Sequence, residues 1–239
     1  MDRSLAEKSY RHIVRKLSRG EFPPGTQLVN RTLASEIGVS VIPVREAIQR
    51  LASEGVVEHV PGAGAFVREP SWRDLDELYV LRDALESCAA EEAALHITAE
   101  QLDELERGLQ EMQHIHAAIE ERRSKVATPA LLNRWLDCEE DFHSILVDAA
   151  RNRLLSKVIR DHRAITRVFD AHRRDPSLLT AQVAETTCRD RRRLLAALRA
   201  RDAALCRRLM SEHIKVGRKT VLNHLHRRRE IGRASGDRA

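Results

Sequence analysis

Hydrophobic residues recur at intervals of three and four along most of this chain, which is typical of amphipathic helices. The pattern is clearest in the segment 99–122, whose apolar stripe consists of Leu102, Leu105, Leu109, Met112, Ile115 and Ile119. It predicts helices at Leu5–Ser18, from a cap at Asn30 to Ile37, and at Ile42–Glu54, Asp74–His96, Ala99–Arg122, Pro129–Ala150, Arg153–Arg173, Leu178–Ala200 and Asp202–Arg227. The apolar runs Val56–Val60 and Ala65–Val67 surround a Gly- and Pro-rich turn and predict a short β-hairpin.

Glycine placement divides the chain in two. Six of the ten glycines fall between Gly20 and Gly64, and none lies between Gly108 and Gly217. Glycine marks tight turns and is unfavourable inside helices. We therefore expect a mainly α protein with a winged helix-turn-helix at 1–69, a linker at 70–73, an antiparallel all-helical bundle at 74–228, and a basic tail without fixed structure at 229–239.

Composition narrows the class of protein without identifying it. The net charge of +5 agrees with a polyanionic partner, and 42% hydrophobic residues are enough for a packed core. The four cysteines form no CxxC pair and are expected to be buried thiols. The charged N-terminus does not resemble a signal peptide, and no apolar run reaches the ~20 residues of a membrane span. These features predict a soluble cytoplasmic protein with no membrane partner.

The third predicted helix carries candidate DNA-reading residues. Such a helix presents its N-terminal residues to base edges in the major groove. Ser40 lies at its N-terminus, where free N–H groups favour a phosphate. Arg45 can pair with a guanine edge through two hydrogen bonds. Arg31 on the preceding helix is a further candidate contact, and Gly62 lets the hairpin approach the minor groove closely.

Three sequence blocks together resemble the GntR family of bacterial regulators. The blocks are Gly20-x-Phe22-x-Pro24-Gly25, Pro43-Val44-Arg45-Glu46-Ala47 with Glu54-Gly55, and Gly62-x-Gly64-x-x-Val67. The resemblance implies that Arg31, Ser40, Arg45 and Gly62 contact DNA. Many members carry Arg, Ser or Thr where this chain has Val41 and Ile42, whose apolar side chains suit thymine methyl groups. Pro43 and Arg50 complete the candidate DNA-contact set, although Arg50 serves equally well as a salt-bridged surface residue.

The C-terminal part resembles the ligand-sensing FCD branch of this family. The residues that carry this resemblance are Leu81-Arg82-x-x-Leu85-Glu86, Phe142-His143-x-x-Leu146, Arg151-Asn152 and Met210-x-x-His213. Ionisable residues also stand on core-facing stripes of the predicted helices, where they are unfavourable without partners. These residues predict an effector pocket formed by Arg82, Glu139, His143, Arg191 and His213. His162 also lies on an apolar stripe, and we expect it to be a core histidine.

Metal-binding members of this branch hold a divalent cation with a carboxylate and three histidines. Glu139, His143 and His213 match three of these positions, but Arg191 stands at the fourth, and arginine cannot ligate a metal. The preferred hypothesis is that Arg191, together with Arg82, binds an anionic effector directly, because a guanidinium matches a carboxylate. The alternatives are a Zn, Ni or Mn ion held by Glu139, His143 and His213, or a buried network that binds nothing.

These features together predict a DNA-binding transcriptional regulator. We expect a homodimeric repressor that binds a palindromic operator and responds to a small organic acid, with no cofactor. A constitutive or architectural DNA-binding dimer is the first alternative, and a metal-dependent sensor of the same family is the second. An enzyme is not expected, since the chain has no Gly-rich phosphate loop, no G-x-S-x-G and no second carboxylate–His motif.

Overall fold

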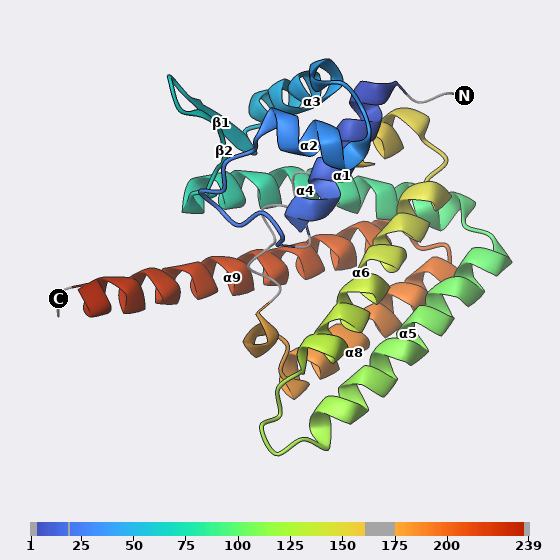
Figure 1. Ribbon diagram of the computed structural model, residues 1–239. Coiled ribbons are helices and arrows are strands. Elements are labelled where there is room, and N and C mark those ends of the chain that lie inside the picture. The colour runs from blue at the N-terminus through green and yellow to red at the C-terminus, as the bar shows by residue number, and fades with distance from the viewer. Residues whose placement is uncertain (1–3, 19, 161–174, 237–239) are drawn as a thin grey trace. The chain divides into compact units, whose positions relative to one another are not determined.

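The computed structural model of the chain describes residues 4–18, 20–160 and 175–236 (Figure 1). The described residues are mainly helical and divide into two compact units, one ending at Arg73 and one beginning at Asp74. His162, which is predicted to be a core histidine, lies outside the described residues. The second half of the helix predicted at 153–173 also lies outside them. Within the described part, no helix is long and apolar enough to span a membrane.

The N-terminal unit contains three helices and a β-hairpin. Helices α1 (Leu5–Ser18), α2 (Asn30–Ile37) and α3 (Val41–Ser53) bury the apolar stripes that the sequence predicts. Strands β1 (Val57–Val60) and β2 (Gly64–Val67) pair antiparallel, with Val57 opposite Val67. This arrangement confirms the predicted winged helix-turn-helix.

The turn between α2 and α3 depends on a glycine. Gly38 has φ 73°, a left-handed conformation that glycine adopts without strain, and its N–H donates to the carbonyl of Ala34. Ser40 is the N-cap residue of α3, as predicted. The predicted cap of α2 is wrong: Val29 is the N-cap residue and Asn30 is already helical, with its side-chain oxygen buried.

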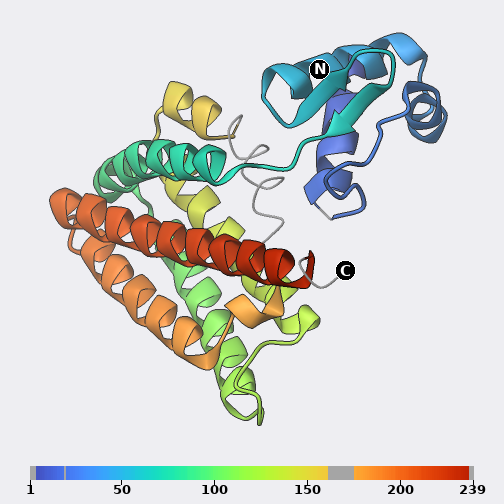
Figure 2. The same ribbon diagram turned by 90° about the vertical axis from the view of Figure 1, so that its left-hand side faces the viewer.

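The C-terminal unit is a helical bundle. Its elements are α4 (Trp72–His96), α5 (Ala99–Glu120), α6 (Pro129–Ala149), a helical segment at 153–160, a 3-10 turn η2 (Pro176–Leu178), α8 (Ala181–Arg199) and α9 (Ala203–Gly236). Helix α5 packs against both α6 and α8, and α8 packs against α9. Arg218 and Lys215 of α9 form ion pairs with Asp76 and Asp83 of α4, so these two helices also lie side by side (Figure 2).

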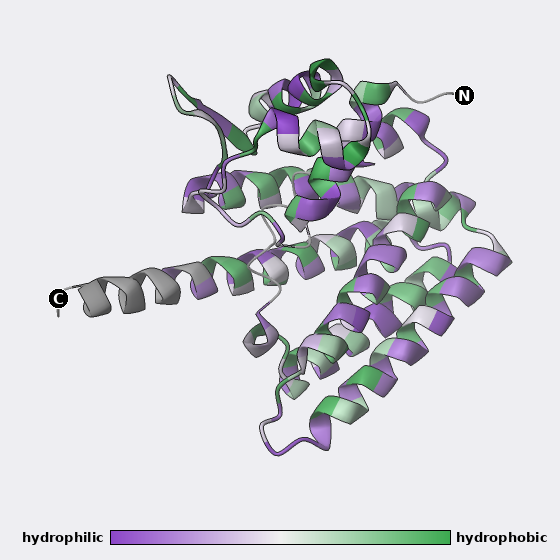
Figure 3. Ribbon diagram, in the orientation of Figure 1, coloured by the Kyte–Doolittle hydropathy of each residue, from purple (hydrophilic) through white to green (hydrophobic). Residues whose placement is uncertain are grey.

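The core of the bundle follows the predicted stripes. Leu105, Leu109, Met112, Ile115 and Ile119 of α5 are all buried. Hydrophobic and hydrophilic residues alternate around the helices at the spacing expected when one face of each is covered (Figure 3). The four cysteines are free thiols, and burial raises the pKa of three of them, to about 11 for Cys138 and Cys188 and about 12 for Cys206.

Three predicted boundaries in this unit differ from the structure. Helix α4 begins at Trp72, inside the expected linker. Helix α8 begins at Ala181, because Pro176 starts a separate 3-10 turn and the Thr180 hydroxyl caps α8 by accepting from the Val183 N–H. Helix α9 continues to Gly236, beyond the expected start of an unstructured tail at 229, since Arg, Glu, Ala and Ile all tolerate a helix.

Candidate functional site

The N-terminal end of α3 presents an exposed surface that suits DNA. Ser40, Ile42 and Arg45 are exposed there, and the Ile42 side chain is 67% exposed. Val41 is half-buried beside them. Arg31 on α2 is exposed as well. A cation, a hydroxyl and a methyl-bearing side chain at one helix end match phosphate, guanine and thymine methyl contacts.

The hairpin turn supplies a second candidate DNA contact. Gly62 is exposed in the turn between β1 and β2 and has φ 76°, a conformation that L side chains rarely adopt. A Cβ atom at Gly62 would have open space around it, so the backbone conformation alone requires glycine here. The bare backbone of this turn can therefore approach a groove or a phosphate.

Two of the predicted DNA contacts, Pro43 and Arg50, also have contacts within the N-terminal unit. Pro43 is buried in the first turn of α3, where it packs within the unit. Arg50 donates to Glu7 of α1 at 2.9 Å and to Glu54 at 3.0 Å, and its guanidinium carbon lies 3.7 Å from the ring centre of Tyr10. The Tyr10 hydroxyl completes this network by donating to Glu54 at 2.7 Å. Arg50 therefore links α3 to α1, and a DNA contact by Pro43 or Arg50 stays a prediction.

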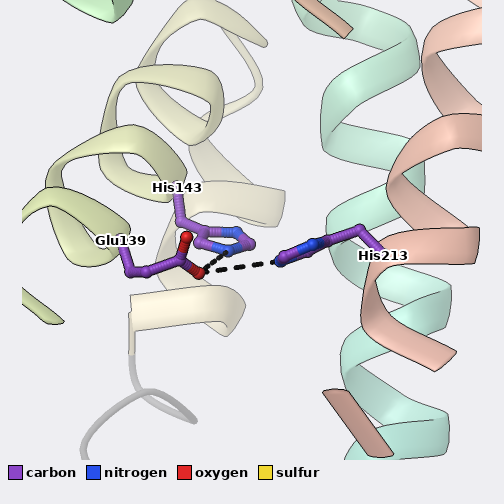
Figure 4. Close-up of side chains that lie close together, drawn as sticks. All are labelled: Glu139, His143 and His213. Atoms are coloured by element: carbon purple, nitrogen blue, oxygen red, sulfur yellow. Dashed lines mark ion pairs between the residues drawn. The ribbon is translucent and has the colours of Figure 1, made fainter. Parts of the chain in front are cut away.

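Inside the C-terminal unit, three polar side chains converge on one nitrogen of Arg191. This arginine, on α8, is only 1% exposed. Its Nη2 donates to Glu139 Oε2 at 3.0 Å and lies 3.1 Å from His143 Nε2 and 3.2 Å from His213 Nε2. Glu139 and His143 project from one face of α6 toward His213 on α9 (Figure 4). The structure thus brings together four of the five predicted pocket residues.

A second layer of charged residues positions His143. Glu86 of α4, 5% exposed, places Oε2 2.6 Å from His143 Nδ1. Arg82 donates from Nε to the other oxygen of Glu86 at 2.9 Å. A carboxylate oxygen this close to Nδ1 favours the tautomer with its hydrogen on Nδ1, which leaves the lone pair on Nε2, the nitrogen beside Arg191. Glu86 was missed as a site residue, although its i,i+4 spacing from Arg82 predicts their ion pair.

The cluster shifts the pKa values of its own members. Burial lowers the pKa of His143 to about 3, although the charges of Glu86 and Glu139 act in the opposite direction. Burial by itself raises the pKa of Glu139, but the Arg191 charge and the two histidines outweigh it and hold this pKa well below its ordinary value. At neutral pH the cluster therefore contains a neutral His143 and an ionised Glu139.

A cavity of about 100 Å³ lies beside the cluster. Its polar wall includes Arg82, Glu139 and His213, together with Asp190. The cavity is also lined by apolar residues, which include Trp135, Leu132, Leu136, Val183 and Ile214. Because a water molecule needs only about 10–15 Å³ by a comparable measure, the cavity has room for a small organic molecule. Arg191 and His143 are not among the residues that line the cavity.

The predicted metal ligands also lie close together. One ligand atom from each of Glu139, His143 and His213 is within 4.8 Å of the other two. Glu139 Oε2 is 4.0 Å from His143 Nε2 and 3.7 Å from His213 Nε2 (Figure 4). Arg191 Nη2 lies within hydrogen-bond distance of all three atoms. The residue types suit a divalent cation, but the position that a cation needs is next to a guanidinium nitrogen.

Both halves of the chain match known protein families. Residues 5–67 match the family model described as bacterial regulatory proteins, gntR family, and residues 77–216 match the FCD domain. The HTH-type transcriptional repressor RspR of Escherichia coli K12 is 28% identical over 87% of this chain and 85% of that protein. A probable D-xylose utilization operon transcriptional repressor of Paenarthrobacter nicotinovorans is 30% identical over 70% of this chain and 78% of its own length.

Solved structures agree on the fold. Escherichia coli McbR/YncC superimposes with a TM-score of 0.71 at 22% identity, and the match covers 94% of this chain and 100% of that one.

The matching families and curated relatives are transcriptional regulators, which confirms the expectation that the chain is not an enzyme. The chain belongs to the gntR family of bacterial regulatory proteins and is a DNA-binding transcriptional regulator with a C-terminal FCD domain.

Proposed function

We propose that this regulator is a repressor whose DNA affinity changes when a small organic acid binds in the cavity of the FCD domain. The single observation that carries the proposal is a cavity lined by two cationic or hydrogen-bonding groups, Arg82 and His213, together with Glu139, Asp190 and apolar residues. Ligand pockets generally combine apolar walls with a few polar groups that fix orientation. Two relatives, RspR and the probable D-xylose utilization operon protein, are named as transcriptional repressors, which supports the proposed sign of regulation.

For the effector, we propose that its carboxylate contacts Arg82 and His213 and that its apolar part packs against Trp135. Arg82 is 13% exposed and His213 is 19% exposed, so both side chains are accessible from the cavity. Arg191, expected from the sequence to bind the acid directly, would hold Glu139 and His213 in place instead. The Nε and Nη1 atoms of Arg191 are buried and have no hydrogen-bond partner among the residues that the structure describes, so a bound water or ligand atom close to them is favourable.

For DNA recognition, we propose that Arg45 reads a guanine and that Ile42 and Val41 contact thymine methyl groups. Ser40 and Arg31 would bind backbone phosphates, and the Gly62 turn would enter the minor groove. The exposure of these side chains at the N-terminal end of α3 supports the assignment. Two such helices in a homodimer match a palindromic operator.

The test begins with DNA fragments that the wild-type protein selects from a random pool. Binding of the selected fragment is then measured by fluorescence anisotropy against a panel of small acids, each paired with its amide. We expect at least one acid to lower the affinity by about tenfold or more, a typical allosteric coupling, while its amide has no effect. Arg82→Gln should abolish the response, and the surface variant Arg207→Gln, which loses only an exposed ion pair with Glu91, should retain it.

Two results would contradict parts of this proposal. If the protein binds the selected DNA but no acid changes the affinity, the chain is a constitutive DNA-binding dimer and the cavity is not an effector site. If amides or amines act as well as acids, the ligand class is wrong, because Glu139 and Asp190 of the wall would then be the contacts.

A further inference from the structure

The three atoms of the buried cluster that could ligate a metal already surround a cation. Glu139 Oε2, His143 Nε2 and His213 Nε2 lie 3.0, 3.1 and 3.2 Å from the same atom, Nη2 of Arg191. Glu86 Oε2 lies 2.6 Å from His143 Nδ1, which favours a hydrogen on Nδ1 and leaves Nε2 as the potential metal ligand beside Arg191. The Arg191 guanidinium is also held from one side by Phe142, whose ring centre lies 3.7 Å from Cζ. The arginine is therefore fixed in place among the side chains that would otherwise ligate a metal.

We propose that the Arg191 guanidinium is the permanent cation of this cluster and closes it to divalent metal ions, so that the FCD domain of this chain is metal-independent. Metal–ligand bonds to imidazole nitrogen and carboxylate oxygen are about 2.0–2.2 Å long. An ion at that distance from Glu139 Oε2 and His143 Nε2, which are 4.0 Å apart, would lie within about 3 Å of Nη2. A guanidinium cannot lose its proton to become a ligand, so the two cations would repel each other.

The charge balance of the cluster supports the same inference. Glu86 and Glu139 are both about 95% buried, and the positive charges beside them belong to Arg82 and Arg191. The two negative and two positive charges already cancel. A divalent ion would add two positive charges to a buried cluster whose carboxylates, Glu86 and Glu139, are already paired with arginines, and buried charge without a partner is strongly unfavourable.

The test compares metal binding by the untagged full-length protein and by four variants. Each protein is incubated separately with Zn²⁺, Ni²⁺ and Mn²⁺, desalted, and analysed for metal by mass spectrometry. Wild type should hold no more metal than its His143→Ala control, because the cluster binds none in either protein. Arg191→His supplies a third imidazole in place of the guanidinium, and a carboxylate with three imidazoles is a favourable zinc donor set. This variant should gain about one equivalent of zinc per chain, and the double variant Arg191→His/His143→Ala should lose it.

Circular dichroism establishes that each variant is folded. Arg191→Ala removes the guanidinium without adding a histidine, so its result does not depend on how a new histidine is oriented. Arg191→Ala should also gain zinc, with water completing the coordination. Metal on the wild type that disappears in His143→Ala would overturn the proposal. It would equally be overturned if the folded Arg191→His and Arg191→Ala variants both fail to bind zinc, since Arg191 would then not be the barrier. Metal held equally by wild type and His143→Ala lies elsewhere on the protein and agrees with a closed cluster.

Discussion

At the residue scale, Arg191 has the largest effect on the chemistry of the C-terminal unit. It is the largest of the fully buried side chains among the described residues, and its charge keeps Glu139 ionised in the core. Without it, Glu139 would be a buried charge next to two imidazoles, and loss of one partner of a buried ion pair costs about 3–5 kcal/mol. The identity of residue 191 therefore decides both the stability and the ligand chemistry of the cluster.

The pKa of His143 predicts a loss of stability on acidification. The imidazole has an ordinary pKa of 6.5 and a pKa of about 3 in the folded protein. Between these pH values the unfolded chain binds a proton that the folded chain does not, so the free energy of unfolding decreases as the pH falls from 6.5. Glu139, whose pKa is lowered, adds to this loss below its ordinary value of 4.5. Urea unfolding at a series of pH values measures the effect.

A matched variant isolates the contribution of His143, since other histidines also titrate. His143→Gln keeps a hydrogen-bonding side chain but cannot titrate. The wild-type protein should lose more stability than this variant between pH 6.5 and 4.5. Parallel curves for the two proteins over that interval would show that His143 is protonated in the folded state, contrary to the pKa given above.

At the scale of elements, α3 performs two tasks on two faces. One face buries Val44, Ala47, Ile48 and Leu51 within the N-terminal unit, and Arg50 adds ion pairs to Glu7 of α1 and to Glu54. The other face carries the exposed Arg45 and Ile42. The position of the exposed face with Arg45 and Ile42 therefore depends on the contacts between α3 and α1.

Two arginine variants of α3 should affect different quantities, one the affinity for DNA and the other the stability of the fold. Arg45→Ala should weaken binding to the selected DNA by about 1–3 kcal/mol and leave the unfolding free energy unchanged, because an exposed base-reading side chain contributes to binding alone. Arg50→Ala should lower the unfolding free energy by about 1 kcal/mol through lost ion pairs and the Tyr10 contact, with a smaller effect on DNA affinity. Anisotropy titrations and urea unfolding of both variants give the comparison. A loss of affinity in Arg50→Ala that equals that of Arg45→Ala would favour a DNA contact by Arg50.

At the scale of the whole molecule, the chain joins a DNA-reading unit to a unit that contains a cavity and a closed polar cluster. A helix-turn-helix protein that binds as a dimer reads two half-sites, each through one recognition helix. Regulation by the proposed effector would then require that it bind with different affinity to two arrangements of the proposed dimer.

The selected DNA should therefore be a palindrome with half-sites about one helical turn apart or closer. A fragment with one half-site scrambled should bind at least tenfold more weakly than the intact palindrome, since only one recognition helix retains its base contacts. Anisotropy titrations with the two fragments at the same salt concentration measure the ratio. Equal affinities would mean that one chain reads the operator alone, and sedimentation of the complex would then show a single protein chain on the DNA.

The sequence by itself determined the fold class, the helix-turn-helix and most helix positions, because apolar spacing, glycines and capping residues act locally. It also identified Glu139, His143, Arg191 and His213 as inward-facing, since each lies on an apolar helical stripe. It did not determine the start of α8 or the end of α9, where a 3-10 turn competes with the α-helix or the helix persists through charged residues.

Only the tertiary structure decided which polar groups meet. Arg191 and Glu139 are 52 residues apart, and His143 and Glu86 come from different helices, so no local spacing connects them. In the structure Arg50 forms an ion pair with Glu7, which is 43 residues away. Arg191 is not among the residues that line the cavity. Contacts of this kind depend on how the helices pack, because a buried charge is stable only where packing brings it a partner of opposite charge.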